Sequence, residues 1–535
     1  MATDTPKAKL PPQIPFIIGN EAAERFSFYG MRNVLTNFLV GYLLIGLAEQ
    51  ERQAAAKEVF HVFVMGVYFF PLLGGWLSDR YLGKYRTILW LSLVYCLGQG
   101  LLAFSVESKP GFYAGLFLIA LGSGGIKPCV SAFVGDQFDQ TNKHLAKVVF
   151  DAFYWIINFG SFFASLLIPP LLSSTPTVIT LGGQVLFTLD TPLPRMAFGI
   201  PAMLMVVATV IFWLGRRRYV NVPPTPSDPH SFARVCLTAL KARSATGSRR
   251  GYTLSVVGLV GAVGALATIP LLGVVASICL AIVVFLVFAG GGAWLQLERA
   301  RGVHPDEDID GVRAVLRVLV IFALVTPFWS LFDQKASTWI LQGNAMQLPG
   351  WSWFKSAAQM QALNPLLVML LIPFNNLVLY PTLKKLGVEP TALRRMGAGI
   401  AFSGLAWIAA ASLQLVLDGG EKLPLLWQSL PYALLTFGEV LVSATGLEFA
   451  YSQAPAKLKG VLMSFWSLSV TIGNLWVLVV NASVKNAAVT KGIADLGFGV
   501  MAFQMFFFAG FAFVAAAAFA WYAKRYTLVD YYRKA

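Results

Sequence analysis

Residues 251–297 read GYTLSVVGLVGAVGALATIPLLGVVASICLAIVVFLVFAGGGAWLQL, which is a run of 47 residues without a charged side chain. A helix needs about 20 apolar residues to cross the hydrocarbon core of a bilayer. The run is therefore long enough for two membrane-spanning helices. Pro270 suits a tight turn between them, because proline interrupts a helix.

The rest of the chain has the same character. Of its 535 residues 57% are hydrophobic and only 13% are charged, whereas a soluble domain carries about 25% charged residues. This composition excludes a disordered, collagenous or disulfide-stapled secreted protein. It predicts an all-α polytopic membrane protein with fourteen transmembrane helices, within residues 16–46, 57–78, 86–105, 111–135, 146–171, 195–215, 251–269, 271–297, 312–342, 356–381, 393–417, 427–452, 458–484 and 499–523.

The net charge of +15 comes from basic residues in short loops, such as Arg80, Lys84 and Arg86 after the second helix. Further clusters lie within 216–250, near residue 390 and at the end of the chain. Lysine and arginine in short loops mark the cytoplasmic side of a membrane protein, so this charge does not indicate a nucleic-acid partner. We expect a plasma (inner) membrane protein with both termini in the cytoplasm.

The helices and loops suggest four regions. We expect an N-terminal six-helix bundle in 1–215, a Pro- and Arg-rich cytoplasmic linker in 216–250, an inserted helix pair in 251–297, and a C-terminal six-helix bundle with a cytoplasmic tail in 298–535. Two sets of six helices of similar length indicate bundles related by pseudo-symmetry.

The first helix carries charges at membrane depth. Glu21, Arg25, Tyr29 and Arg32 share one face of a helix, and Glu24 lies beside it. A charge at the bilayer centre costs roughly 2.5–3.5 kcal/mol, so such residues should face a partner or a water-filled cavity. Glu21 is near the start of the helix and could instead reach the membrane interface.

Other polar residues interrupt the apolar runs. Lys127 follows a glycine-rich stretch that lacks the GxxxxGK[ST] spacing of a phosphate loop, so we expect these glycines to allow close helix packing. Tyr154 and Asn158 lie one turn apart on the fifth helix, as do Glu439 and Ser443 on a later one.

Several stretches resemble known signatures. Residues 75–86 (GWLSDRYLGKYR) resemble the loop signature of the major facilitator superfamily, with a weaker echo at 381–395. The segment EAAERF at 21–26 resembles a motif of the proton-dependent oligopeptide transporters, the peptide-transport branch of that superfamily. The other stretches that resemble this family are 123–138, 153–161, 327–334, 361–366, 438–449 and 464–466. The inserted helix pair is similar to that of prokaryotic members.

The resemblance implies the major facilitator fold and a proton-coupled symporter that imports di- and tripeptides by alternating access. It implies no enzymatic activity and no cofactor other than the proton, which acts as the coupling ion. The expected partners are the peptide substrate, protons and the lipid bilayer. The expected functional form is a monomer. A transporter of nitrate, a nucleoside or an amino acid on the same scaffold is the alternative.

The resemblance also implies residue roles that side-chain chemistry supports. Arg25, Arg32 and Lys127 would bind the peptide carboxylate, and Glu439 its ammonium. The expected proton-coupling residues are Glu21, Glu24, Arg25, Lys127 and Glu439, with attraction between Lys127 and Glu439 across the two bundles. The expected substrate-binding residues are Arg25, Tyr29, Arg32, Tyr68, Lys127, Tyr154, Asn158, Trp329, Phe332, Asn364, Glu439, Ser443 and Trp466.

Some alternatives stay open for single residues and for the protein class. Tyr68 could serve core packing alone, and His61 could be either a proton group or a structural residue. A membrane-embedded hydrolase would need a Ser/His/Asp set, a metal set or paired carboxylates. We disfavour it, because no histidine pairs with a nucleophile motif, and His61, His144, His230 and His304 are too dispersed to suggest a metal cluster.

Overall fold

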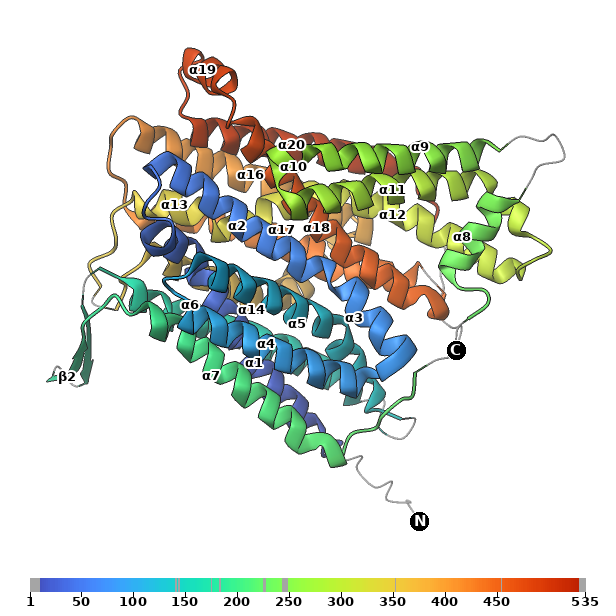
Figure 1. Ribbon diagram of the computed structural model, residues 1–535, viewed down its shortest axis with the longest axis horizontal. Coiled ribbons are helices and arrows are strands. Elements are labelled where there is room, and N and C mark those ends of the chain that lie inside the picture. Colours follow the sequence, from blue (N-terminus) through green and yellow to red (C-terminus); the bar gives the residue numbers. More distant parts are fainter. Residues whose placement is uncertain are drawn as a thin grey trace. The chain divides into compact units, whose positions relative to one another are not determined.

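The computed structural model describes residues 10–528, except 140–141, 143–144, 175, 182–183, 225–227, 243–248, 352 and 454; His144 thus lies outside the described residues. Thirteen helices in the described part are long and apolar enough to cross a membrane. Helix α1 (Ile14–Phe38) adds a fourteenth that is long enough but carries four charges. The prediction of an α-helical membrane protein is confirmed (Figure 1).

The chain forms two compact units, and the first combines Met1–Pro224, Lys335–Pro373 and Lys422–Ala433. Two segments from the second half of the sequence therefore pack with the first half. The helices of this unit are α1, α2 (Glu49–Phe69), α3 (Pro71–Leu77), α4 (Lys84–Phe104), α5 (Lys109–Asp136), α6 (Ala146–Leu167), α7 (Pro194–Leu214), α13 (Thr338–Asn344) and α14 (Leu363–Phe374) up to Pro373.

Within the first unit α1 packs against α6 and α7, and α4 packs against α5 and α7 (Figure 1). Phe38, Phe112 and Phe198 form a fully buried aromatic cluster where α1, α5 and α7 meet. Between α6 and α7 the chain forms an antiparallel hairpin of β1 (Thr177–Leu181) and β2 (Gln184–Leu189), which the helix pattern did not predict.

Glycines bring α3 and α5 into close contact, as the sequence predicts for the glycine-rich stretch of the fourth predicted span. A Cβ atom placed on Gly74 would collide with the backbone carbonyl oxygen of Gly125. The neighbouring Gly75 has open space around the same position. Backbone-to-backbone packing at this crossing therefore requires a glycine at 74 and tolerates a larger residue at 75.

We expect the Gly74→Val substitution to lower the melting temperature of the detergent-solubilised protein by about 5 °C, since overpacking costs about 1–3 kcal/mol. Gly75→Val is the matched control and should melt within about 1 °C of the unmodified protein. Equal melting temperatures for both variants would contradict this account of the crossing.

The second unit combines Thr225–Gln334, Phe374–Glu421 and Leu434–Ala535. In it α9 runs along α11, and α16 runs along α20 (Figure 1). The helices of this unit are α8 (Phe232–Lys241), α9 (Arg250–Ala265), α10 (Ile269–Leu272), α11 (Val274–Gln296), α12 (Asp306–Asp333), α15 (Tyr380–Lys385), α16 (Ala392–Asp418), α17 (Ser429–Ser452) from Leu434, α18 (Lys459–Ser483), α19 (Ala487–Asp495) and α20 (Val500–Ala523).

The expected linker 216–250 contains a helix, α8, that the sequence analysis did not predict. Its Val235 and Ala239 are fully buried. Gln296 at the end of α11 donates from Nε2 to the Ala239 carbonyl oxygen at 3.0 Å. Burial also raises the pKa of the Cys236 thiol to about 12, so this thiol is inert at neutral pH. The helix α8 within the linker is thus a docked element of the second unit.

Candidate functional site

The charged face of α1 forms a buried ion cluster in the first unit. Arg25 Nε lies 2.6 Å from Glu21 Oε1 and 3.2 Å from Glu24 Oε2. Glu21 and Glu24 are 1% and 2% exposed, so Glu21 pairs with Arg25 instead of reaching the membrane interface. Two carboxylates thus share one guanidinium, and a single proton would balance the charge of the cluster.

Buried hydrogen bonds hold α1 in place against its neighbours. Asn20 Nδ2 donates to the Ala208 carbonyl oxygen of α7 at 2.9 Å, and Ser27 Oγ donates to that of Pro201 at 2.7 Å. Gly160 of α6 allows a close approach beside Arg25. These contacts fix the rotation of α1 and therefore the direction of its charged face.

Lys127 of α5 lies against aromatic rings of α1 and α2. Its Nζ atom is 4.3 Å from the ring centroid of Tyr68 and 4.6 Å from that of Phe28. The charge of Lys127 also acts on the Glu24 carboxylate. The structure therefore places Lys127 and Tyr68 together, with the ammonium group against the face of the tyrosine ring.

The remaining predicted residues of the first unit have more local partners. Arg32 is buried with its guanidinium carbon 5.2 Å from the Phe60 ring centroid, and Tyr29 contacts the ring of Phe28. Asn158 Nδ2 donates to the carbonyl oxygen of Tyr154 at 3.0 Å, one turn back on α6. Tyr154 is exposed in the structure.

Asn364, one of the expected substrate-binding residues, accepts a hydrogen bond from an ammonium group of the chain itself. Lys335 Nζ donates to Asn364 Oδ1 at 2.7 Å, and Lys335 is 4% exposed. Lys335 is not among the site residues predicted from the sequence. The signal that identified Arg25, a charge inside an apolar run, applies equally to Lys335 and could have found it.

Buried polar contacts also join α1 and α2 to the segment that follows α12. His61 Nε2 and Ser337 Oγ lie 2.9 Å apart, and Thr36 Oγ1 donates to the Ala336 carbonyl oxygen at 2.7 Å. Gln361 Nε2 donates to the Asn33 carbonyl oxygen at 3.2 Å. These bonds link residues of the second half of the chain to helices α1 and α2 within the first unit.

In the second unit the structure brings together three predicted aromatic residues. The Trp329 ring centroid lies 5.8 Å from that of Phe332 and 5.7 Å from that of Trp466. A Cβ atom on Gly446 of α17 would collide with the Trp466 indole. Gly446 therefore provides the space that this aromatic cluster needs.

Glu439 and Ser443 lie one turn apart on α17 and are both half-buried. On the neighbouring helices of the same unit, Asn474 Nδ2 donates to Asp333 Oδ2 at 2.8 Å, and Asp333 is 3% exposed. Asp333 is a second buried charge that the sequence analysis did not select as a site residue.

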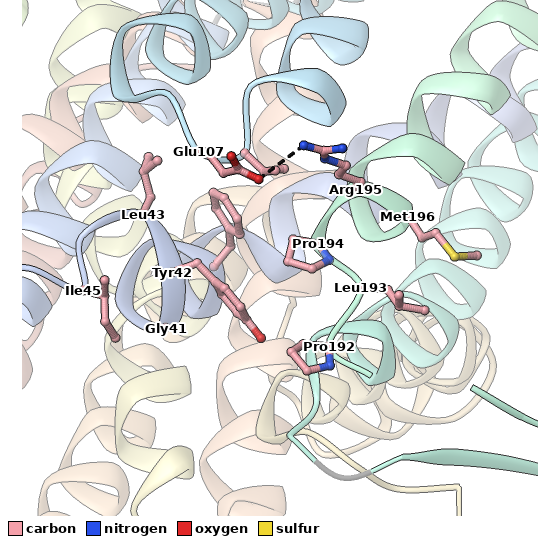
Figure 2. Close-up of a pocket in the computed structure, with 12 residues that line it drawn as sticks. Gly41, Tyr42, Leu43, Ile45, Glu107, Pro192, Leu193, Pro194, Arg195 and Met196 are labelled. Carbon is pink, nitrogen blue, oxygen red and sulfur yellow. Dashed lines mark hydrogen bonds and ion pairs between the residues drawn. The ribbon is translucent and has the colours of Figure 1, made fainter. Parts of the chain in front are cut away.

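A surface cavity lies beside Phe38, the last residue of α1, and the Gly41–Leu43 segment that follows it (Figure 2). Glu107 and Arg195 form an ion pair at its rim, with Arg195 Nη2 3.2 Å from Glu107 Oε1 (Figure 2). Tyr42 and the run from Pro192 to Met196 contribute to its lining. None of the predicted site residues lines this cavity, so it is not the site that the buried charges define.

A sequence profile described as the POT family matches residues 85–498. The chain belongs to the POT family. This membership sets aside the membrane hydrolase considered from the sequence. It also agrees with the buried, paired charges on α1, which lie outside the matched range and were recognised from the sequence alone.

Relatives and solved structures of the POT family agree with this assignment. "Peptide transporter family 2" of Caenorhabditis elegans is 34% identical over 423 residues, covering 77% of this chain and 48% of the relative. Human "Solute carrier family 15 member 2" is 31% identical over 421 residues, covering 76% and 49%. The chain thus spans about half the length of the curated relatives it matches.

Two crystal structures are similar over nearly the whole chain. An "auto inhibited POT family peptide transporter" is 61% identical with a TM-score of 0.91, covering 98% of this chain and 99% of the other. A "proton dependent oligopeptide (POT) family transporter" is 59% identical with a TM-score of 0.80, covering 95% and 100%. The major facilitator fold expected from the loop signatures is therefore confirmed.

Proposed function

We propose that this POT family chain is a proton-coupled symporter that imports di- and tripeptides by alternating access. The observation that carries the proposal is the guanidinium of Arg25, which Glu21 and Glu24 share in a buried site. A peptide carboxylate that approaches Arg25 competes with Glu24 for the same cation. Glu24 can give up its share when it binds a proton, which links peptide binding to protonation.

Further residues are proposed to bind the two charged ends of the peptide and its side chains. Arg32 and Lys127 supply further positive charge for the carboxylate, and Glu439 is the proposed acceptor for the ammonium. The aromatic cluster of Trp329, Phe332 and Trp466 offers apolar surface for variable side chains. The proposed supporting polar contacts come from Tyr29, Tyr68, Tyr154, Asn158, Asn364 and Ser443.

Alternating access requires that one side of the transporter opens while the other closes. The bonds of His61 with Ser337 and of Thr36 with Ala336 join elements distant in the sequence. We propose that these bonds hold the outer side closed and break when it opens. This assigns His61 a gating contact, in addition to any proton that its imidazole carries.

We also propose the setting in which the protein works. The protein would lie in the plasma (inner) membrane, and the positive loops together with the even number of spans support a cytoplasmic location of both termini. Each chain carries a full set of proposed binding residues, which supports a functional monomer. No cofactor other than the transported proton enters the proposed mechanism.

The proposal predicts proton-driven uptake of labelled dialanine into proteoliposomes that contain the purified protein. With one proton per peptide, an inward gradient of one pH unit should support up to about tenfold accumulation, because one pH unit corresponds to 1.36 kcal/mol. A proton ionophore should reduce the internal concentration to the external one.

The competing solutes test the alternative substrates. Unlabelled dialanine and trialanine should compete with the labelled peptide, whereas nitrate, a nucleoside and alanine should not. Accumulation that survives the ionophore would contradict proton coupling, and displacement by nitrate or a nucleoside would contradict a peptide site.

A further inference from the structure

Three fully buried polar side chains lie near Glu24 and take no part in the proposed transport mechanism. They are Tyr95 and Gln99 of α4 and Ser123 of α5, each with no exposed surface. A polar group in such a place is costly unless it is hydrogen-bonded, so a set of three beside a buried carboxylate calls for an explanation.

The Tyr95 hydroxyl is the centre of this group. It lies beside the Glu24 carboxylate, and Gln99 and Ser123 flank it. Gln99 Nε2 donates to Ser27 Oγ at 3.1 Å. The side-chain oxygen of Gln99, Oε1, can therefore face Tyr95 as a hydrogen-bond acceptor. Among the described residues, Tyr95 Oη, Ser123 Oγ, Gln99 Oε1 and both Glu24 oxygens make no well-aligned hydrogen bond.

Packing at the helix crossing brings Tyr95 to this position. A Cβ atom on Gly122 of α5 would lie 2.7 Å from the Cβ atom of Tyr95. Only a glycine at 122 lets α4 approach α5 closely enough here, and this approach buries the tyrosine beside α1. Besides the charged side chains of Arg25, Glu21 and Lys127, the neutral Tyr95 hydroxyl also acts on Glu24.

A tyrosine hydroxyl can both donate and accept a hydrogen bond, and it changes between the two by rotating one O–H bond. It can donate to Glu24 when the carboxylate is ionised. It can accept from Glu24 when the carboxyl group is protonated, while its own proton turns to Gln99 Oε1 or Ser123 Oγ. The buried carboxyl group therefore keeps a partner in both protonation states.

We propose that Tyr95 is a positioning residue for the coupling proton on Glu24, and that Gln99 Oε1 or Ser123 Oγ accepts a hydrogen bond from the Tyr95 hydroxyl when Glu24 is protonated. The only covalent bond that forms in this step is the O–H bond between the arriving proton and the Glu24 carboxylate. The Tyr95 hydroxyl keeps its own proton and only rotates. The proposal rests on the proposed proton-coupled transport and adds a specific residue to it.

The test uses the pH dependence of dialanine uptake by the Tyr95→Phe variant in proteoliposomes. Phenylalanine keeps the ring and removes only the hydroxyl. The ionised carboxylate loses the stronger, charge-assisted bond, so protonation becomes easier and the pH of half-maximal uptake should rise by about one unit. Exchange of labelled for unlabelled dialanine without a gradient should stay within about twofold of the unmodified protein.

Tyr219→Phe is the matched control. Its buried hydroxyl donates to the Phe212 carbonyl oxygen at 3.0 Å in another part of the same unit, and its loss should leave the pH profile unchanged. Ser123→Ala provides a second test. It removes an acceptor that the Tyr95 hydroxyl uses when Glu24 is protonated, so it should shift the profile by less and in the opposite direction, to lower pH. In a Glu24→Gln background, Tyr95→Phe should not change exchange further, because both act on one interaction.

The outcomes separate the two proposals. If the unmodified protein shows no proton-driven uptake, the proposed function fails. If it does, and Tyr95→Phe and Ser123→Ala both keep its pH profile, the positioning role is overturned and the proposed function stands. If Tyr95→Phe does not fold, the profile of Ser123→Ala alone decides in the same way.

Discussion

Replacing Glu24 by glutamine is expected to abolish concentrative peptide uptake. The side chain is buried, lies 3.2 Å from Arg25 Nε and is proposed to carry the coupling proton. Glutamine has nearly the same shape but cannot exchange a proton. For a gradient of one pH unit, accumulation of up to about tenfold should fall to an internal concentration equal to the external one.

The measurement compares net uptake with gradient-free exchange of labelled dialanine in the same proteoliposomes. Exchange should persist in Glu24→Gln, because the neutral side chain resembles the protonated carrier. Glu107→Gln is the matched control, since the Glu107 side chain is 85% exposed in its ion pair with Arg195. Undiminished accumulation by Glu24→Gln would remove Glu24 from the coupling mechanism.

The second large effect is expected for Lys127→Ala, measured as dipeptide affinity. Lys127 Nζ lies 4.3 Å from the Tyr68 ring centroid, and we propose that it binds the substrate carboxylate. A hydrogen bond to a charged group contributes about 1.5–3 kcal/mol, so affinity for dialanine should fall about 10- to 150-fold.

The effect should depend on the free carboxylate of the substrate. A dipeptide amidated at its C-terminus already lacks the charge that Lys127 would bind, so its weaker affinity should change little in the variant. Lys109→Ala alters an exposed lysine at the start of the same helix and should leave both affinities unchanged. Equal losses for the free and amidated peptides would show that Lys127 serves the structure and not the carboxylate.

Local patterns in the sequence were sufficient for the membrane helices and for part of the site. Hydropathy located the spans, because a helix in a bilayer must be apolar along about 20 consecutive residues. The charges of Glu21, Glu24 and Arg25 stood out for the same reason. Their helical spacing also places them together, and the structure shows them as one ion cluster.

Other features depend on residues that are distant in the sequence. Lys335 meets Asn364, and Tyr95 meets Glu24, through the packing of different helices. The helix α8 escaped the analysis because its surroundings are rich in proline and arginine. Its burial against α11 and α12 stabilises it, which outweighs its weak local pattern.

The fold class, the family and the charged face of α1 could therefore be predicted from residue patterns along the chain, because each depends on spacing within a segment. Which neighbour each buried polar group has depends on how the helices pack. Tyr95, Gln99 and Ser123 are ordinary residues in apolar helices when viewed along the chain. They become candidates for proton handling only because Gly122 lets α4 approach α5 beside the carboxylate of Glu24.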